Sequence, residues 1–249
     1  MTPFRIEDSS TSHVGNVRKQ NEDSHFSAHD QAVWLVADGM GGHANGKMAS
    51  ETLAATVGTV SLPETIEPAC EALSAAIGQA NLAIYEQGRQ LGVQMGTTAV
   101  ALVLRSHEFG VLWAGDSRAY VFRDDTLIQL TRDHTQVEDL VERGLLSVED
   151  AADHPMKHVL SRAVGVQEAL LVDAICDRAL PRDLFLLCTD GLHGVVEDAE
   201  IAAILRQRGP GAADALVAAS LARGGPDNVT VTLVAISEPT LLVLNGARA

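Results

Sequence analysis

The chain has 249 residues, 46% of them hydrophobic, and a formal net charge of −15. A nucleic-acid-binding domain normally presents a basic face, and this sequence has no cluster of Lys and Arg. Nucleic acids and anionic membranes are therefore disfavoured as partners. No segment approaches the roughly 18 apolar residues of a membrane span, and residues 1–10 lack the apolar core of a signal peptide. We expect a globular, cytoplasmic protein.

The hydrophobic pattern predicts strands and helices in blocks rather than in strict alternation. Strands are expected at 5–12 and 33–37, followed by two helices at 44–60 and 66–91. The pattern then predicts strands at 97–105, 109–114, 118–123, 127–130, 170–177, 184–189 and 228–236, with helices at 198–208 and 211–223. This order indicates an α+β layered domain.

Residues 133–165 are polar, charged and helical only in short pieces. We expect this segment to be a surface insert rather than part of the core. No repeat or long linker divides the chain, so the sequence predicts a single domain over 1–239 and a loosely held tail at 240–249.

The three cysteines lie far apart in the sequence, at Cys70, Cys176 and Cys188. An odd number without a CxxC pair argues against a disulfide framework or a cysteine zinc site. We expect all three to be buried thiols that pack as small apolar groups. Trp34 and Trp113 lie in apolar strands and are expected in the core.

Aspartates stand at the ends of several apolar strands, namely Asp38, Asp190 and Asp227, and Asp116 lies between two strands. Carboxylates gathered at one rim would repel each other and have raised pKa values. Divalent cations that prefer hard oxygen ligands, such as Mg²⁺ or Mn²⁺, would neutralise them. Each motif alone is most often a turn or a cap. Their joint occurrence favours a metal site, and Gly39 would let its backbone carbonyl turn toward a metal.

The motifs together resemble one family. The stretches VRKQNEDS, VADGMGGHANG, GTTAV, WAGDSRAYVFRD, HVLSRAVG, LLCTDGL and GGPDNVTV are similar to the bacterial branch of the PP2C-type (PPM) metal-dependent serine/threonine protein phosphatases, in order and spacing, from about residue 11 to residue 236. The resemblance implies a four-layer αββα sandwich, in which two antiparallel β-sheets are flanked by pairs of helices. It also implies that 133–165 is a mobile flap beside the active site.

The resemblance further implies two Mg²⁺ or Mn²⁺ ions per chain. By position, Asp38 would bridge both metals, and the carbonyl of Gly39 would bind one of them. Asp190 and Asp227 would hold the first metal.

The second metal would be served by Glu22 and Asp23, directly or through water, with Asp23 the stronger candidate. Asp116 matches the position that supports a third, weaker metal together with Asp190. Arg18 matches the arginine that contacts the substrate phosphate, which a guanidinium can clamp through two oxygens.

The implied reaction is hydrolysis of phosphoserine or phosphothreonine on another protein. A metal-bridging water or hydroxide would attack directly, without a phosphoenzyme. His43 is the candidate general acid, with phosphate binding or loop ordering as alternative roles. In the flap, His154 and His158 are candidates for substrate choice, although solvated surface histidines are an equally good interpretation. We expect a monomer that opposes a serine/threonine kinase.

Two positions depart from the family's common pattern. Thr189 stands where serine is common and keeps the hydroxyl, and His193 is expected at the surface near the metal rim. The alternative functions are a non-catalytic member that binds a phosphoprotein or senses a ligand, and a phosphoesterase for small molecules. The complete set of acids, together with Arg18, favours the enzyme.

Overall fold

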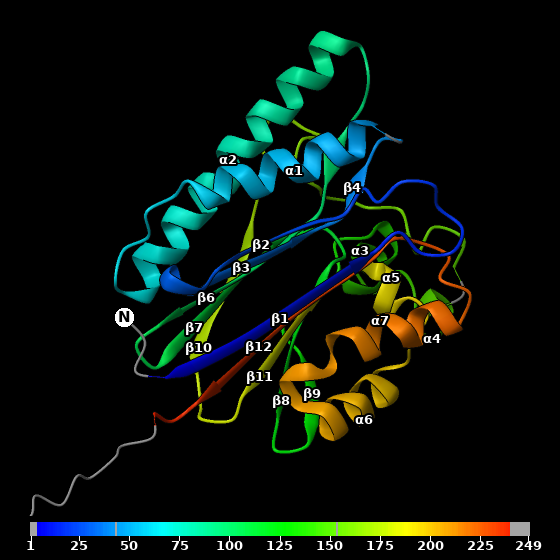
Figure 1. Cartoon of the computed structure of the whole chain (residues 1–249). Coiled ribbons are helices and arrows are strands. Elements are labelled where there is room, and N and C mark those ends of the chain that lie inside the picture. The colour runs from blue at the N-terminus through cyan, green and yellow to red at the C-terminus, as the bar shows by residue number, and fades with distance from the viewer. Residues whose placement is uncertain (1–3, 43, 153, 240–249) are drawn as a thin grey trace, which may run out of the picture.

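The computed structural model describes residues 4–42, 44–152 and 154–239. Within them, two five-stranded antiparallel sheets lie face to face, with helices on both outer sides (Figure 1). One sheet has the order β1 (Arg5–His13), β12 (Val229–Ser237), β11 (Leu184–Cys188), β8 (Arg118–Arg123), β9 (Thr126–Gln129). The other has the order β10 (Asp173–Arg178), β7 (Glu108–Ala114), β6 (Ala99–Arg105), β3 (Val33–Ala37), β2 (Ser24–Ala28).

Pairs of helices form the two outer layers (Figure 1). Helices α1 (Ala44–Gly58) and α2 (Ile66–Leu91) pack on the sheet that contains β3, and α6 (Asp198–Arg208) and α7 (Ala213–Ala222) pack on the sheet that contains β12. The order of layers is therefore αββα, and the predicted fold class is confirmed.

Strand β3 shows why its sequence, VWLVA, has no polar alternation. Val33 and Leu35 face the helical layer of α1 and α2, whereas Trp34 and Val36 face the other sheet. Because both faces of the strand are covered, every one of its residues is buried. Between the sheets, the rings of Phe109 and Phe185 lie 4.9 Å apart, centroid to centroid.

Most of the predicted elements are present, and the differences are local. The predicted strand at 33–37 and the predicted helix at 66–91 have the observed bounds. Strand β2 was not predicted, because it is short and alternates only between partly buried and exposed residues. A two-stranded sheet of β4 (Gly39–Met40) and β5 (Gly96–Thr97) was also missed.

The flap segment 133–165 contains two short helices, α3 (Gln136–Glu142) and α4 (Val148–Ala152), as predicted. The expectation that it lies wholly at the surface was wrong. Val137 is buried, and Val164 belongs to the core cluster beneath α1 and α2. The flap is therefore packed into the domain at both of its ends.

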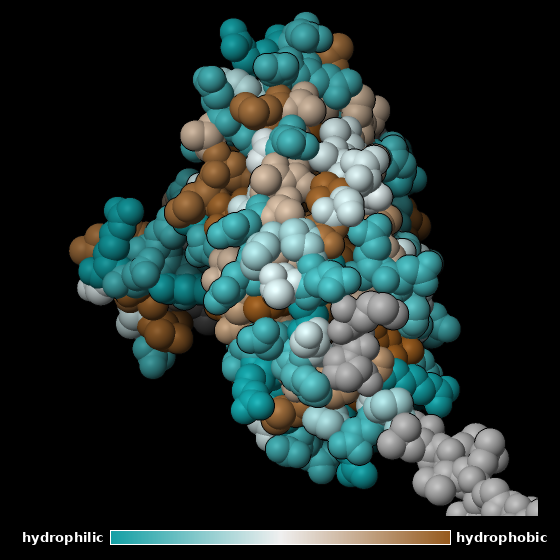
Figure 2. All heavy atoms as spheres, turned by 90° about the vertical axis from the view of Figure 1, so that its left-hand side faces the viewer, coloured by the Kyte–Doolittle hydropathy of each residue, from teal (hydrophilic) through white to brown (hydrophobic). Residues whose placement is uncertain are grey.

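Trp34 and Trp113 are core residues, as expected. Cys70 and Cys188 are buried, but Cys176 is exposed, so the prediction of three buried thiols was wrong for one. The error arises because Cys176 lies in β10, an edge strand. No helix in the described part of the chain is long and apolar enough to cross a membrane. The face seen in Figure 2 mixes hydrophilic and hydrophobic residues.

Candidate metal centre

A cavity of about 640 Å³ opens at one rim of the sandwich. The acids that line it come from separate elements. Asp38 directly follows β3, one residue separates Asp190 from the end of β11, and one residue separates Asp227 from the start of β12. Asp116, from the loop between β7 and β8, and Glu22, which precedes β2, also line this cavity. Residues from five parts of the chain are thus brought to one place by the pairing of the strands.

The main chain of Asp38 is held on both sides by threonines. The hydroxyl of Thr98 accepts a hydrogen bond from the Asp38 N–H at 2.9 Å. The N–H of Thr98 and the hydroxyl of Thr97 donate to the Asp38 carbonyl, at 2.8 and 2.9 Å. The Thr98 hydroxyl also lies 2.6 Å from that of Ser117. The GTTAV motif therefore fixes the position of Asp38.

Gly39 and Gly46 allow two segments to pack against each other. A Cβ at Gly39 would overlap the carbonyl oxygens of Gly46 and Glu22, and a Cβ at Gly46 would overlap a carboxylate oxygen of Glu22. Only glycine fits at both positions. This close packing brings the first turn of α1 beside Asp38 and holds Glu22 at the cavity. The hydroxyl of Ser50 in α1 also donates to the Glu22 carbonyl at 2.5 Å.

Asp23 is buried and is held by two threonine hydroxyls. Thr189 and Thr230 both donate to its Oδ2, at 3.0 and 2.7 Å. The Thr189 hydroxyl also accepts a hydrogen bond from the Thr230 N–H at 3.0 Å, so it contributes to both contacts. Asp23 is not among the residues that line the cavity, whereas its neighbour Glu22 is.

The carboxylates of this rim raise each other's pKa values. Burial raises the pKa of Asp38 well above its ordinary value, and the charge of Asp23 adds to this effect. Burial likewise raises the pKa of Asp23 to about 7 and that of Asp116 to about 8. Burial, followed by the charge of Asp227, raises the pKa of Asp190, whereas a side-chain hydrogen bond with Asp38 lowers it. Ionising all of these acids together is unfavourable without a cation.

Two buried oxygen atoms indicate where a cation would fit. Among the described residues, the buried side-chain oxygens with no hydrogen-bond partner are Oδ1 of Asp23 and Oδ1 of Asp190. Buried carboxylate oxygens are normally paired or bound to metals. Over the same residues, no three His, Cys, Asp or Glu side chains already surround one point. The unpaired oxygens are the stronger indication, because a buried carboxylate oxygen without a partner is costly unless a cation pairs with it.

Arg18 reaches the rim from the segment between β1 and β2. Its Nη2 donates to Oδ2 of Asp227 at 2.6 Å, and its side chain is 55% exposed. Asn228 positions this segment, because its side chain donates to the carbonyls of Val14 and Gln20, at 2.9 and 3.0 Å. The side-chain oxygen of Asn228 also accepts the N–H of Glu22 at 2.8 Å.

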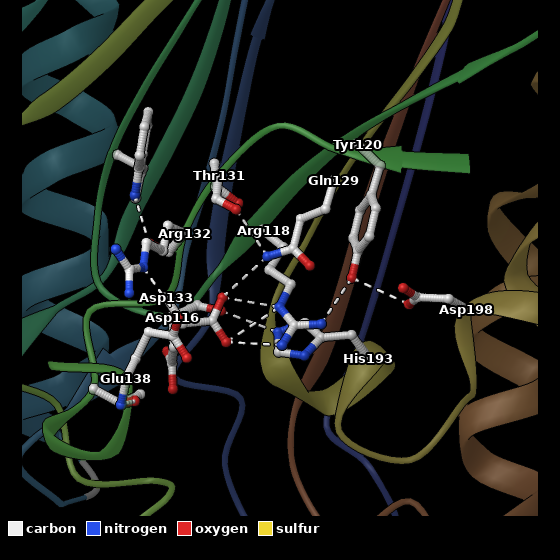
Figure 3. A network of polar contacts seen from close by, with 12 residues as sticks. Asp116, Arg118, Tyr120, Gln129, Thr131, Arg132, Asp133, Glu138, His193 and Asp198 are labelled. Carbon is white, nitrogen blue, oxygen red and sulfur yellow. Dashed lines mark hydrogen bonds and ion pairs between the residues drawn. The ribbon is translucent and has the colours of Figure 1, made fainter. Parts of the chain in front are cut away.

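A polar network supports the loop that carries Asp116 (Figure 3). His193, from the short helix α5 (Asp190–His193), donates from Nε2 to the Asp116 carbonyl at 3.0 Å. We infer this donor because a carbonyl can only accept. In the same network, Arg118 forms a bidentate ion pair with Asp133 and donates to the Tyr120 hydroxyl at 3.0 Å. His193 is partly buried, so the expectation of a surface residue is confirmed only in part, and burial lowers the pKa of its imidazole to about 3.

The flap forms the opposite wall of the cavity with residues 158–163. His158 lines the cavity and is exposed, whereas His154 is not among the lining residues. The structure therefore brings one of the two flap histidines to the site. His43 lies outside the described residues.

Sequence reasoning missed the residues that attach the flap. The Nδ1 of His134 accepts the Gly115 N–H at 3.1 Å, so its Nε2 carries the proton and donates to Asp173 at 3.2 Å. Arg162 donates to the same carboxylate at 2.5 Å. Trp113 stacks on His134, with ring centroids 6.0 Å apart. The HVLSRAVG motif contained Arg162, but nothing in the sequence identified its partner.

Comparisons with known proteins agree with this geometry. A family model described as protein phosphatase 2C matches residues 7–144. The serine/threonine phosphatase stp of Listeria innocua is 36% identical over 231 residues, which cover 88% of this chain and 92% of that protein. The serine/threonine protein phosphatase PstP of Mycobacterium tuberculosis is 36% identical over 222 residues, which cover 88% of this chain and 43% of that protein.

Solved structures are similar over nearly the whole fold. PppA, described as a key regulatory component of T6SS in Pseudomonas aeruginosa, superimposes with a TM-score of 0.86 at 37% identity, over 93% of this chain and 97% of that one. The catalytic domain of PstP in complex with 2 manganese ions gives a TM-score of 0.84 at 33% identity, over 94% and 99% of the two chains. The chain therefore belongs to the protein phosphatase 2C family of bacterial serine/threonine phosphatases.

Proposed function

We propose that this protein removes phosphate from phosphoserine or phosphothreonine on other proteins, and that two Mg²⁺ or Mn²⁺ ions at the carboxylate rim support the reaction. The observation that carries the proposal is the set of buried acids around one cavity, in which Oδ1 of Asp190 has no hydrogen-bond partner. Family membership and the similar structure with two manganese ions support metal dependence. Direct attack by water activated at this centre, without a phosphoenzyme, is part of the proposal.

The proposed ligands follow from the positions of the acids. Asp38, the most deeply surrounded by other carboxylates, would be shared by both ions. Asp190 and Asp227 would complete one site together with the Gly39 carbonyl. Glu22, which lines the cavity, and the buried Asp23 would complete the other, the latter through water. When bound, the ions would lower the pKa of a water molecule and offset the negative charge of the phosphate.

Asp116 is proposed as part of a third, weaker site shared with Asp190. Its carboxyl is buried, and burial followed by the charge of Asp190 raises its pKa to about 8. The His193 hydrogen bond to the Asp116 carbonyl fixes the loop without using the carboxylate itself. That carboxylate therefore remains available for a cation.

Two arginines line the cavity, Arg18 and Arg162, and Arg18 is the one that lies beside the proposed metal ligand Asp227. Its guanidinium lies at the cavity beside Asp227 and is more than half exposed, so it can turn toward a phosphate without unpacking. Two of its N–H groups match two phosphate oxygens, which a lysine could not reproduce. His43 is proposed as the general acid for the leaving oxygen. His158 at the cavity, and His154 farther along the flap, are proposed to affect substrate choice.

The substrate is proposed to be a phosphoprotein of a serine/threonine kinase pathway, and the working unit a monomer. We further propose that residues 1–239 form one catalytic domain with 133–165 as its flap and 240–249 as a tail. The chain covers 92% of the Listeria innocua phosphatase, which supports this extent of the domain.

One assay tests the proposal. The purified protein with Mn²⁺ should hydrolyse p-nitrophenyl phosphate and a phosphothreonine peptide, and EDTA should abolish both activities. Asp38→Ala and Asp190→Ala should be inactive under the same conditions. Activity that survives chelation would exclude the two-metal proposal. Binding of the phosphopeptide without turnover by the metal-loaded protein would instead favour the non-catalytic alternative.

A further inference from the structure

Two cysteines that are far apart in the sequence meet outside the metal centre. The sulfur atoms of Cys70, in α2, and Cys176, in β10, lie 3.5 Å apart although the residues are separated by 106 positions. Both are free thiols, and neither lines the catalytic cavity. The third cysteine, Cys188, is completely buried and belongs to a different core cluster from Cys70.

A glycine makes room for this contact. Gly110 of β7 stands directly opposite Cys176 in the antiparallel register. A Cβ at Gly110 would overlap the sulfur of Cys70, and the side chains of Val103 and Ile66 surround the same spot at 3.2 and 3.4 Å. The Cys70 sulfur therefore occupies the space that any other residue at 110 would need. Glycine inside a strand often marks such a close approach.

The two sulfurs can come closer without disturbing the core. A disulfide needs about 2.05 Å between the sulfur atoms, so the pair must close by about 1.5 Å. β10 is an edge strand that pairs only with β7, and the Cys176 side chain is exposed. An exposed side chain on an edge strand can change rotamer at little cost, because solvent covers part of its surface.

We propose that Cys70 and Cys176 form a reversible disulfide when the protein meets a peroxide. The peroxide first oxidises the exposed Cys176 thiol to a sulfenic acid and releases one water. The Cys70 sulfur then attacks the Cys176 sulfur, the S–O bond breaks, and the hydroxyl leaves as a second water with the Cys70 proton. The two thiols lose two electrons and two protons in total, and one peroxide is reduced to two waters.

Accessibility sets this order of steps. Cys70 is buried, and burial followed by the neighbouring Cys176 raises the pKa of its thiol to about 12, so it reacts poorly with an external oxidant. The charge of Arg105 acts in the opposite direction and favours the Cys70 thiolate. Cys70 therefore serves as the resolving thiol, held at the distance needed to react with an oxidised neighbour before a second peroxide does.

The test counts thiols in the native, Mn²⁺-loaded protein before and after hydrogen peroxide. Maleimide labelling after denaturation should find three thiols in the reduced protein and one, Cys188, in the oxidised protein. Peptide mapping without reductant should recover Cys70 joined to Cys176, and dithiothreitol should restore three thiols. Three remaining thiols, or a sulfinic acid at Cys176 without the cross-link, would overturn the proposal.

Matched variants separate this pair from general oxidation. Cys188→Ser should form the cross-link at the wild-type rate, and Cys176→Ser should keep both of its remaining thiols. Gly110→Ala retains all three cysteines but displaces the Cys70 sulfur, so it should slow cross-linking by at least about tenfold. Equal rates in Gly110→Ala and the wild type would contradict a pair held ready by Gly110.

Discussion

The two walls of the cavity are held in different ways. On the carboxylate wall, three hydrogen bonds with Thr97 and Thr98 fix the main chain of Asp38, and Asp190 follows a fully buried strand. The flap wall is held by an ion pair between Arg162 and Asp173 and by a hydrogen bond from His134 to Asp173, and the side chains of Arg162 and Asp173 are partly exposed. The proposed reaction chemistry therefore uses the wall whose main chain is fixed by hydrogen bonds. Under this proposal, the flap wall can vary for substrate recognition without rebuilding the metal centre.

The largest effect is expected for Asp38→Asn, which keeps the size of the side chain and removes its charge. We expect kcat to fall by well over 100-fold for p-nitrophenyl phosphate and for phosphopeptide alike. Outer-shell changes around metal sites cost about 10–100-fold, and a shared ligand should cost more. Steady-state kinetics at saturating Mn²⁺ measure this.

Thr98→Val is the matched control on the same wall, because it removes the hydroxyl that accepts the Asp38 N–H but leaves the carboxylate in place. A loss of about tenfold is expected, within the outer-shell range. If Thr98→Val were as damaging as Asp38→Asn, position rather than charge would dominate at this residue.

A smaller effect, confined to large substrates, is expected for Asp173→Asn on the flap wall. The carboxylate accepts from Arg162 and His134, and removing its charge weakens both contacts. Because the pair is partly exposed, about 1 kcal/mol should be lost, or about a fivefold rise in KM for a phosphoprotein. Hydrolysis of p-nitrophenyl phosphate should change by less than about twofold, because under the proposal this small ester binds mainly through its phosphate at the carboxylate wall. Equal losses with both substrates would contradict the division between the walls.

The sequence was sufficient to bring together the acids of the carboxylate wall. Asp38, Asp190 and Asp227 could be predicted as neighbours because each lies at the end of a strongly apolar strand, and strand ends of a sandwich meet at its rims. The flap contacts could not be predicted. His134 and Asp173 are 39 positions apart, and their pairing depends on how β10 packs beside β7. The Cys70–Cys176 contact was missed for the same reason.

The carboxylate wall should also make the metal-free protein sensitive to pH. Asp23 and Asp116 have folded pKa values of about 7 and about 8, above the ordinary value of 3.8. The folded state therefore holds protons that the unfolded state has lost, and its free energy of unfolding must fall as pH rises through this range. His193 acts in the opposite direction, but only below about pH 6.5, because burial lowers its pKa to about 3.

We therefore expect the denaturation midpoint in EDTA to decrease from pH 6.5 to pH 8.5. Asp116→Asn should make this decrease shallower, since one of the rim acids with a raised pKa is removed. Saturating Mn²⁺ should remove most of it, because the cation stabilises the ionised acids of the folded state alone. A midpoint in EDTA that stays constant over this range would show that the rim acids are already ionised at pH 6.5.

The smallest effects are expected for single acids in the metal-free protein, where Asp190 and Asp133 should respond with opposite signs. Asp190→Asn removes one of several mutually repelling carboxylates and should raise the melting temperature in EDTA by a few degrees, about 1 kcal/mol. Asp133→Asn removes the partner of Arg118 in a mostly buried, two-pronged ion pair and should lower it by a similar amount. Calorimetry in EDTA and in Mn²⁺ distinguishes the two, because the gain from Asp190→Asn should reverse once metal is present. If both variants were destabilised in EDTA, Asp190 would serve the fold as well as the reaction.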